Sequence, residues 1–330
     1  MFYKITFSLI AFLLVSVPKA EAHVRYLIDE KTAEKNSGAD YGFLINAISD
    51  TKNLGLIAWT IAGTILIIIA STRIKIIRNK LNLISQKADS YLVFTPWMLR
   101  LSLGIALIGS GSSLNLISPA LPGFESFATI QILLGFLIMA GFLVIPASIA
   151  AIGIYIYALT QDTYIIGNLD FIAVAIALLV LDNEKPGLDD LLNIPKFSPF
   201  CACKKFVPLI LRFGIGGAMV FLAIYEKILN PHLSELIVLG FDLQKVVPVS
   251  PEMWVFSAGI IEFVIGLFLI LGAFTRITSA IAFIVLSLSF FYFGEDVASH
   301  ITLFGILSVL FVTEGGSFSL DRWSKKFLKA

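Results

Sequence analysis

Long apolar runs separated by short polar stretches dominate the chain. After a polar stretch that ends near Asn53, nine runs span or nearly span a bilayer about 30 Å thick. Their approximate cores are 54–72, 97–117, 127–144, 147–160, 171–181, 206–225, 253–272, 277–293 and 300–312. Several are shorter than the roughly 20 residues of an isolated span, which predicts tilted or broken helices. The pattern therefore predicts an all-α polytopic membrane protein with about nine transmembrane helices in the mature chain.

The first 22 residues have the pattern of a secretory signal peptide. Lys4 precedes an apolar run over residues 5–17, and Ala20-Glu21-Ala22 offers a small-x-small cleavage site. We expect cleavage there, with His23 as the mature N-terminus; an uncleaved signal anchor is the alternative. Residues 23–53 are polar, with mixed charges and no strong period. They predict a short extracytoplasmic segment packed on the outer face.

The distribution of Lys and Arg predicts the orientation independently, because these residues concentrate on cytoplasmic loops. With residue 23 outside, the inner segments carry Arg73, Lys75, Arg78, Lys80, Lys87, Lys185, Lys196, Lys204, Lys205, Arg276, Arg322, Lys325, Lys326 and Lys329. The outer segments carry only Arg25, Lys31, Lys35, Lys52, Lys227 and Lys245. This predicts an N-terminus outside and a C-terminus inside a prokaryotic-type plasma membrane. We interpret Arg212, Arg276 and Arg322 as topology anchors at the cytoplasmic face.

Two blocks of the chain resemble each other, and residues 99–119 align without gaps with residues 211–231. Leu99-Arg100, Gly104, Pro119, Gln131, Gly135, Gly141 and Leu188-Asp189 align with Leu211-Arg212, Gly216, Pro231, Glu262, Gly266, Gly272 and Leu320-Asp321. The chain is therefore predicted to be a tandem duplication. Its parts are a leading helix with a basic linker (54–96), a first four-helix repeat (97–191), a linker (192–205), a second repeat (206–323) and a basic tail (324–330).

An even number of helices in each repeat makes the two repeats parallel, related by an axis near the membrane normal. Spanning helices approach closely where small residues line their contact. We expect the repeats to form a pseudo-dimer packed through Gly109, Gly111, Gly214, Gly216 and Gly217.

Only the second repeat carries these charges inside its spans. The positions of Glu226, Lys227, Glu262 and His300 are held in the first repeat by Leu114, Asn115, Gln131 and Asn168. Ionisable groups in hydrocarbon are costly and usually mark function. The functional site is therefore expected in the second repeat.

Helix geometry places these polar residues near one another. Glu262 lies about 13 Å along its span at 1.5 Å per residue, near the middle of the bilayer. Tyr225, Glu226 and Lys227 reach the outer interface, and His300 begins the last span on the same side. We expect Glu226, Lys227 and His300 around the mouth of a cavity with Glu262 at its floor.

Such a set can bind a quinone head group or a small anion and pass protons, because His titrates near neutral pH and Lys227 supplies a positive field. Glu262 and His300 are the candidates for proton transfer, and Tyr225, Glu226 and Lys227 for ligand binding. In the structural alternative, Glu262 pairs with His300, Lys227 or an inner Arg and only fixes helix packing.

Composition narrows the function classes. The chain is 58% hydrophobic and 14% charged with a net charge of +1, which excludes a soluble globular protein and gives no basic groove for nucleic acid. Cys201 and Cys203 are too few for a disulfide framework. No dinucleotide, haem-attachment or hydrolase motif stands out, so no covalently bound cofactor is expected, and a redox cofactor would belong to a partner or arrive as quinone. No metal site is predicted, since His23 is only a weak candidate for a copper ligand.

The second repeat carries several polar and glycine landmarks in order over about 206–323. They are Arg212-x3-Gly216, Tyr225-Glu226-Lys227, Asn230-Pro231, Glu262-x3-Gly266-x5-Gly272, Phe274-Thr-Arg276, Gly294, His300 and Ser319-Leu-Asp-Arg322. With these residues the repeat resembles the DoxX/DoxD family of four-helix membrane proteins. That family includes the small membrane subunit of an archaeal thiosulfate:quinone oxidoreductase and other members of redox or oxidative-stress complexes. The resemblance implies a redox-linked membrane role, and the additional repeat and leading helix depart from the family pattern.

Three function classes follow. The first is a redox-linked membrane subunit or accessory that interacts with quinone and with a membrane or extracytoplasmic redox partner. The second is a carrier for a small solute, suggested by parallel repeats and a midplane carboxylate. The third is a non-catalytic scaffold that holds an extracytoplasmic partner. Whether the chain is itself an enzyme is left open by the sequence.

Overall fold

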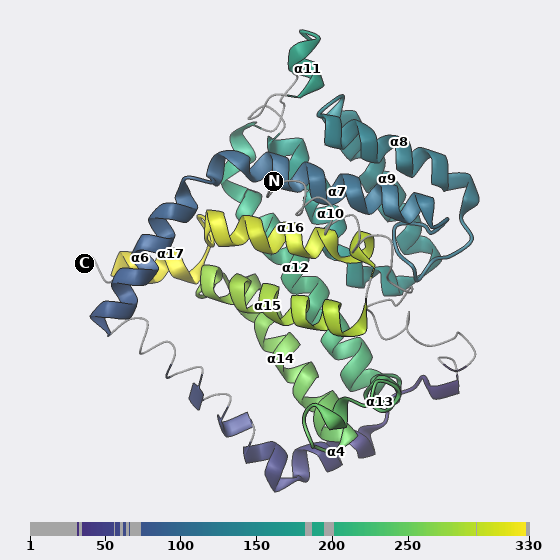
Figure 1. Cartoon of the computed structure of the whole chain (residues 1–330), viewed down its shortest axis with the longest axis vertical. Coiled ribbons are helices and arrows are strands. Elements are labelled where there is room, and N and C mark those ends of the chain that lie inside the picture. Colours follow the sequence, from purple (N-terminus) through teal and green to yellow (C-terminus); the bar gives the residue numbers. More distant parts are fainter. Residues whose placement is uncertain are drawn as a thin grey trace, which may run out of the picture.

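The computed structural model describes residues 35–55, 74–181, 187–194, 201–294 and 296–327, together with Thr32 and residues 57–59, 62–63 and 66. Within these residues the chain is helical and contains no strand (Figure 1). Two groups of four long helices form the body. The first group is α7 (Thr95–Ser112), α8 (Glu125–Ala140), α9 (Val144–Gln161) and α10 (Leu169–Leu181). The second is α12 (Val207–Leu222), α14 (Pro251–Leu271), α15 (Thr275–Phe293) and α16 (Val297–Thr313).

Shorter elements lie at the ends of these helices. The α-helical ones are α4 (Tyr41–Ser49), α6 (Lys75–Asp89), α11 (Leu188–Leu191), α13 (Pro231–Gly240) and α17 (Leu320–Phe327). Short 3-10 helices are η1 (Leu92–Phe94), η2 (Thr163–Asn168), η4 (Cys201–Phe206) and η6 (Leu243–Lys245), and η5 (Ala223–Leu229) is a π-helix that continues α12. In Figure 1, α6 and α17 lie at one end of the second group, whereas α4 lies beside α13 and the start of α14.

The helices have the length and composition of membrane spans. Six described helices are long and apolar enough to cross a bilayer, at 83–112, 144–161, 163–181, 202–229, 251–271 and 275–293. Helices α8 and α16 are apolar but shorter. Together these apolar helices imply a lipid bilayer as their environment, and the prediction of a helical membrane protein is confirmed.

Several predicted boundaries were wrong. The span expected over 97–117 ends at Ser112, because the Gly- and Ser-rich end of α7 turns back and the hydroxyl of Ser110 donates to the carbonyl of Ile117 at 2.6 Å. The segment before residue 53 was expected without helical period, yet it contains α4, whose first turn is capped by the Asp40 carboxylate accepting from the N–H of Phe43. The signal peptide, His23 and most of the leading span 54–72 lie outside the described residues.

The two groups pack through α16 on α7 and α10 on α12. Gly109 faces Ala298 of α16, Gly214 faces Ala173 of α10, and Gly217 faces Leu169, so these three glycines lie between the groups as expected. The other two do not. Gly111 faces Ala128 of α8 and Gly216 faces Gly266 of α14, which places both inside their own group. Their lack of a side chain brings neighbouring helices of one group together.

Aligned residues make the same contacts in the two groups. Gly104 and Gly135 abut across α7 and α8 as Gly216 and Gly266 do across α12 and α14. Each second helix ends at a left-handed glycine, Gly141 with φ +67° and Gly272 with φ +63°.

An aspartate then caps the third helix of each group. The Asp189 carboxylate accepts from the N–H of Leu143 at 3.0 Å, and the Asp321 carboxylate accepts from the N–H of Phe274 at 2.6 Å. Both capped residues have positive φ, +49° and +48°. The aligned sequence positions therefore have matching local structure, although the number of repeats stays a prediction.

Candidate functional site

The site begins where α12 changes to the π-helix η5. Ala223–Leu229 follows α12 directly, and Pro231, which has no N–H to donate, begins α13. The amide of Asn230 donates to the carbonyl of Tyr225 at 2.8 Å, and the hydroxyl of Ser234 donates to the carbonyl of Glu226 at 2.9 Å. These bonds satisfy carbonyls at the end of the spanning helix. Single π-turns in α-helices are frequent at functional sites, and this one carries Glu226 and Lys227.

Three charged side chains form one ion cluster. The ammonium Nζ of Lys227 lies 2.7 Å from Oε2 of Glu226 and 2.9 Å from Oε2 of Glu262 on α14. Two carboxylates therefore share one cation. Close approach of α14 allows this geometry, since Gly259 packs directly on the Lys227 side chain. Lys227 keeps 11% of its side-chain surface exposed and Glu226 keeps 3%.

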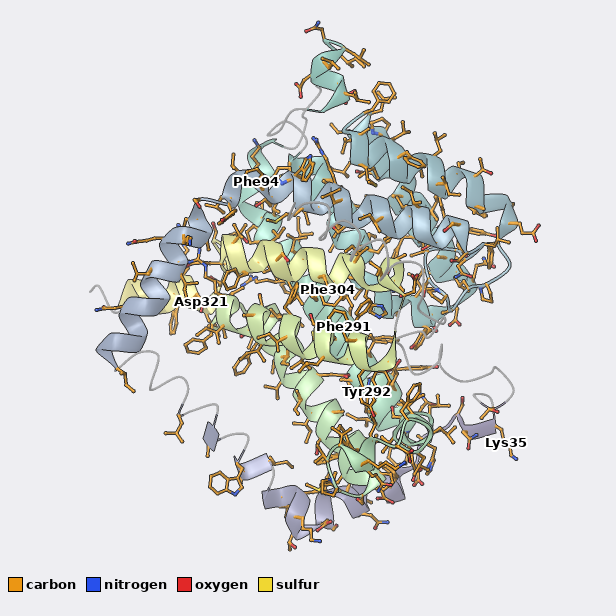
Figure 2. The ribbon with its side chains drawn as sticks, in the orientation of Figure 1. Lys35, Phe94, Phe291, Tyr292, Phe304 and Asp321 are labelled. Atoms are coloured by element: carbon orange, nitrogen blue, oxygen red, sulfur yellow. The ribbon has the colours of Figure 1, made fainter. Side chains whose placement is uncertain are left out.

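The ion cluster and His300 line one cavity of about 90 Å³ between α12, α14, α15 and α16. Apolar side chains close the rest of it, among them Met219, Leu286 and Phe304. Figure 2 labels Phe304 between α15 and α16, where its ring packs on the edges of Phe283 and Phe290. The four ionisable residues that the sequence singled out therefore come together, as the helix geometry predicted.

The order of burial differs from the prediction. Glu226 and His300, expected at the mouth, are buried, whereas Glu262, expected at the floor, keeps 32% of its side-chain surface exposed. The positive field expected from Lys227 is also offset, because both carboxylates lie within 3 Å of its ammonium. With both ionised, the cluster has a net charge of −1 and does not attract an anion.

Tyr225, a predicted ligand-binding residue, does not line the cavity. Its ring stacks on Phe221 with 5.5 Å between centroids and lies 5.3 Å from the ring of Tyr164. Tyr164, in η2 of the first group, is the tyrosine that contacts the cluster, because its hydroxyl donates to Oε1 of Glu226. Sequence reasoning missed Tyr164. The aromatic pair with Tyr225 forms only through tertiary packing, so no local pattern signalled it.

The first group replaces the ion cluster with neutral hydrogen bonds. Gln131, aligned with Glu262, donates from Nε2 to the carbonyl of Asn115 at 2.8 Å and accepts from the N–H of Ile117 at 2.9 Å. Asn115 is the residue aligned with Lys227. The connection that follows α7 folds over Gln131 and uses its hydrogen-bonding groups. At these aligned positions, therefore, charged side chains occur in the second group and neutral ones in the first.

A buried carboxylate outside the cavity was also missed. Asp170 of α10 is 2% exposed and accepts a hydrogen bond from the hydroxyl of Thr302 on α16. This bond links the first group to the second. Asp170 lies in the first turn of an apolar helix, a position where acidic residues are common, so the sequence did not single it out.

The three predicted topology anchors lie at the end of the bundle that carries α6 and α17. Arg212 is buried and donates to the carbonyl of Phe318 at 2.7 Å. Arg276 donates to the carbonyls of Phe311 and Val312 and pairs with Asp89 of α6 and Glu314. Arg322 donates to the hydroxyl of Ser317 and is partly exposed. Figure 2 labels Asp321, the cap of α15, at the same end.

Comparison with known proteins bears on the second group. Residues 207–295 match the DoxX family model. The chain carries a DoxX domain. No curated protein and no solved structure matches the chain. The match covers α12, α14 and α15 with Glu226, Lys227 and Glu262, so this part of the chain is similar to the DoxX family, and the described helices include six that are long and apolar enough to cross a membrane.

A histidine latch joins α4 to α13 outside the spanning helices. His232 lies 2.9 Å from Glu235 through Nδ1 and 3.0 Å from Asp40 through Nε2. Hydrogen bonds first to Glu235 and then to Asp40 raise the pKa of His232 above its usual 6.5. The pKa of Asp40 is lowered, first by the N–H of Phe43 and then by His232. Asn230 adds a bond to this contact by accepting from the N–H of Gly38 at 2.9 Å.

We expect this latch to weaken as pH rises. A raised histidine pKa gives stability that is fully present below 6.5 and lost as pH rises through the higher folded value. The lowered pKa of Asp40 gives stability that is fully present above 3.8 and lost as pH falls through the lower folded value. The protection of the α4 amides, taken as the intrinsic exchange rate at each pH divided by the observed rate, should therefore be highest between these limits and fall above neutral pH. In His232→Asn this fall should disappear; an unchanged profile in that variant would contradict the assignment.

Proposed function

We propose that this chain is a membrane subunit of a redox-linked complex and that the ion cluster of Glu226, Lys227 and Glu262, with His300, holds and passes protons. The sharing of one cation by two carboxylates that line one small cavity carries the proposal. The fully ionised cluster has one excess negative charge, which is costly inside a membrane protein. Uptake of one proton removes it. Proton exchange is therefore the chemistry that these residues support best.

Glu262 and His300 give the cluster two routes for a proton. Glu262 is the most exposed member and provides entry from the surface of α14. His300 borders the same cavity, and its Nδ1 lies 2.9 Å from the hydroxyl of Ser299. A cavity of about 90 Å³ has room for a few waters, each about 30 Å³ in the liquid, to link the two residues.

A quinone ring does not fit this cavity. Pockets for drug-sized ligands span roughly 300–1,000 Å³, whereas this one holds about 90 Å³. Two carboxylates also hold the ammonium of Lys227. The redox part of the proposal therefore rests on the resemblance to DoxX/DoxD proteins of redox complexes and places no quinone at the cluster.

The wider architecture is part of the proposal. We infer a cleaved signal over 1–22, an outer N-terminus, an inner C-terminus and two parallel four-helix repeats in a prokaryotic-type plasma membrane. The matching glycine contacts and aspartate caps of the two groups support a duplication. An extracytoplasmic redox partner would meet the surface formed by α4 and α13.

Proton exchange is tested with Glu262→Gln in the purified full-length chain. Wild type reconstituted in vesicles should carry protons in response to an applied membrane potential, and Glu262→Gln should lower that rate at least about tenfold, as expected for loss of a proton-transfer group. Glu252→Gln, in the first turn of the same helix and outside the cavity, is the matched control and should behave as wild type.

Infrared difference spectra across the pH range supply a second readout. Wild type should show a carboxyl band that shifts in D2O and is lost in Glu262→Gln or Glu226→Gln. Equal proton rates in all folded variants, together with no titrating carboxyl band, would overturn the proton role. Accumulation of a labelled solute would favour the carrier, and a partner bound equally by wild type and Glu262→Gln would favour the scaffold.

A further inference from the structure

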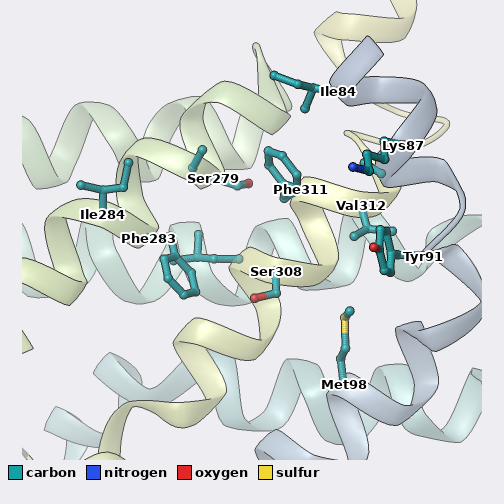
Figure 3. Close-up of a pocket in the computed structure, with 13 residues that line it drawn as sticks. Ile84, Lys87, Tyr91, Met98, Ser279, Phe283, Ile284, Ser308, Phe311 and Val312 are labelled. Atoms are coloured by element: carbon teal, nitrogen blue, oxygen red, sulfur yellow. The ribbon is translucent and has the colours of Figure 1, made fainter. Parts of the chain in front are cut away.

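An open apolar groove of about 480 Å³ lies between α6, α15 and α16 (Figure 3), at the end of the bundle that carries α6 and α17 (Figure 1). Its walls include Ile84, Tyr91, Met98, Phe283, Ile284 and Phe311. None of the residues that line it borders the cavity of the ion cluster. Its volume falls in the range of ligand pockets. The proton exchange proposed above does not use this groove.

Two polar side chains stand out in this apolar groove. Lys87 of α6 is exposed, and Figure 3 places it beside Tyr91 and Val312. Ser279 of α15 is fully buried, and within the described residues its Oγ has no hydrogen-bond partner. A buried hydroxyl without a partner costs free energy. The site therefore offers a cation and a hydroxyl donor to a ligand that is otherwise apolar.

Helix α6, which forms one wall of the groove, is basic and amphipathic. Lys75, Arg78, Lys80 and Lys87 lie on α6, with Asp89 as its one acidic residue. Asp89 pairs with Arg276 of α15 at 2.5 Å, so that contact adds no net negative charge. Basic amphipathic helices at a membrane surface attract anionic lipids. Lys87, the basic residue among those that line the groove, therefore favours an anionic ligand that comes from the bilayer.

Polarity falls from the rim of the groove inwards. On α15, Ser279 lies one turn closer to the end of the bundle than Phe283 and Ile284. Lys87 is at the rim beside Val312, the groove residue nearest the end of α16. A phospholipid has the same order, with a charged phosphate, then ester carbonyls, then hydrocarbon. We propose that this groove binds one anionic phospholipid, with its phosphate against Lys87, an ester carbonyl at Ser279 and an acyl chain along Phe283 and Ile284.

The test uses native mass spectrometry of the full-length chain released from nanodiscs of phosphatidylglycerol and phosphatidylcholine in equal amounts. Wild type should retain one phosphatidylglycerol about tenfold more often than phosphatidylcholine. Lys87→Gln should lower that preference about fivefold, as expected for loss of one basic residue near the headgroup. Lys245→Gln, an exposed lysine near α13, is the matched charge control and should retain the wild-type preference.

Two further variants separate binding from folding. Ala280→Phe fills the groove and should abolish retention of both lipids. Ser279→Ala removes a hydroxyl that has no partner, so its thermal stability in lipid-free detergent should equal or exceed wild type while lipid retention falls. Equal retention of both lipids by wild type, or undiminished retention in folded Ala280→Phe, would overturn the proposal. Retention of a co-purified quinone in place of phospholipid would also overturn it.

Discussion

Replacement of Lys227 by Met should lower the free energy of unfolding by about 3–5 kcal/mol, the usual cost of removing one partner of a buried ion pair. The ammonium of Lys227 lies 2.7 Å from Glu226 and 2.9 Å from Glu262, so the substitution leaves two carboxylates near one another without their shared cation. Met fills a similar volume, and the loss is therefore electrostatic. Unfolding by SDS titration in mixed micelles, followed by circular dichroism, measures the change.

Two controls make the Lys227 result specific. Lys245→Met removes an exposed lysine that pairs with Asp242 at 2.5 Å, and exposed pairs contribute about 0–1 kcal/mol. The triple variant Glu226→Gln, Lys227→Met, Glu262→Gln removes all three charges and should recover most of the lost stability. A Lys227→Met protein as stable as the Lys245→Met control would mean that the cluster is hydrated and would remove the basis for a closed ionic site.

The sequence predicts the class of fold well because the bilayer imposes strong rules on composition and length. Apolar runs located the spans of both helix groups, and the aligned glycines marked close helix contacts. The predicted ends of helices were wrong where local backbone conformation and hydrogen bonds, rather than hydropathy, determine where a helix ends. The helix expected to reach Ile117 ends at Ser112, and the π-helix over 223–229 continues a span past its predicted end at Tyr225. Neither of these helix ends can be detected from hydropathy averaged along the sequence.

The candidate site was predicted at the level of residue type but not of geometry. Charge inside a span singled out Glu226, Lys227, Glu262 and His300, and all four line one cavity. Burial could not be predicted, because it depends on which neighbouring helices cover each residue. Tyr164 shows the same limit, since its bond to Glu226 joins residues 62 positions apart.

Close contact between α12 and α14 is the condition for the ion cluster, because Lys227 follows α12 and Glu262 lies on α14. Gly216 sets this contact. A Cβ at Gly216 would lie 2.6 Å from the carbonyl oxygen of Gly266, closer than real Cβ atoms come to a backbone atom. Side-chain rotation cannot relieve that overlap, so a larger residue must push the two helices apart. The distance from Lys227 to Glu262 would then increase as well.

Gly216→Leu should therefore destabilise the chain by about 3 kcal/mol, the upper end of the usual range for overpacking. Gly153→Leu is the matched control, since Gly153 lies in spanning helix α9 and a Cβ there meets nothing within 4 Å. The same SDS titration compares them, and the infrared carboxyl band reports on the cluster. A Gly216→Leu protein as stable as Gly153→Leu, with an unchanged carboxyl band, would show that α12 and α14 are not held in the close contact that the cluster requires.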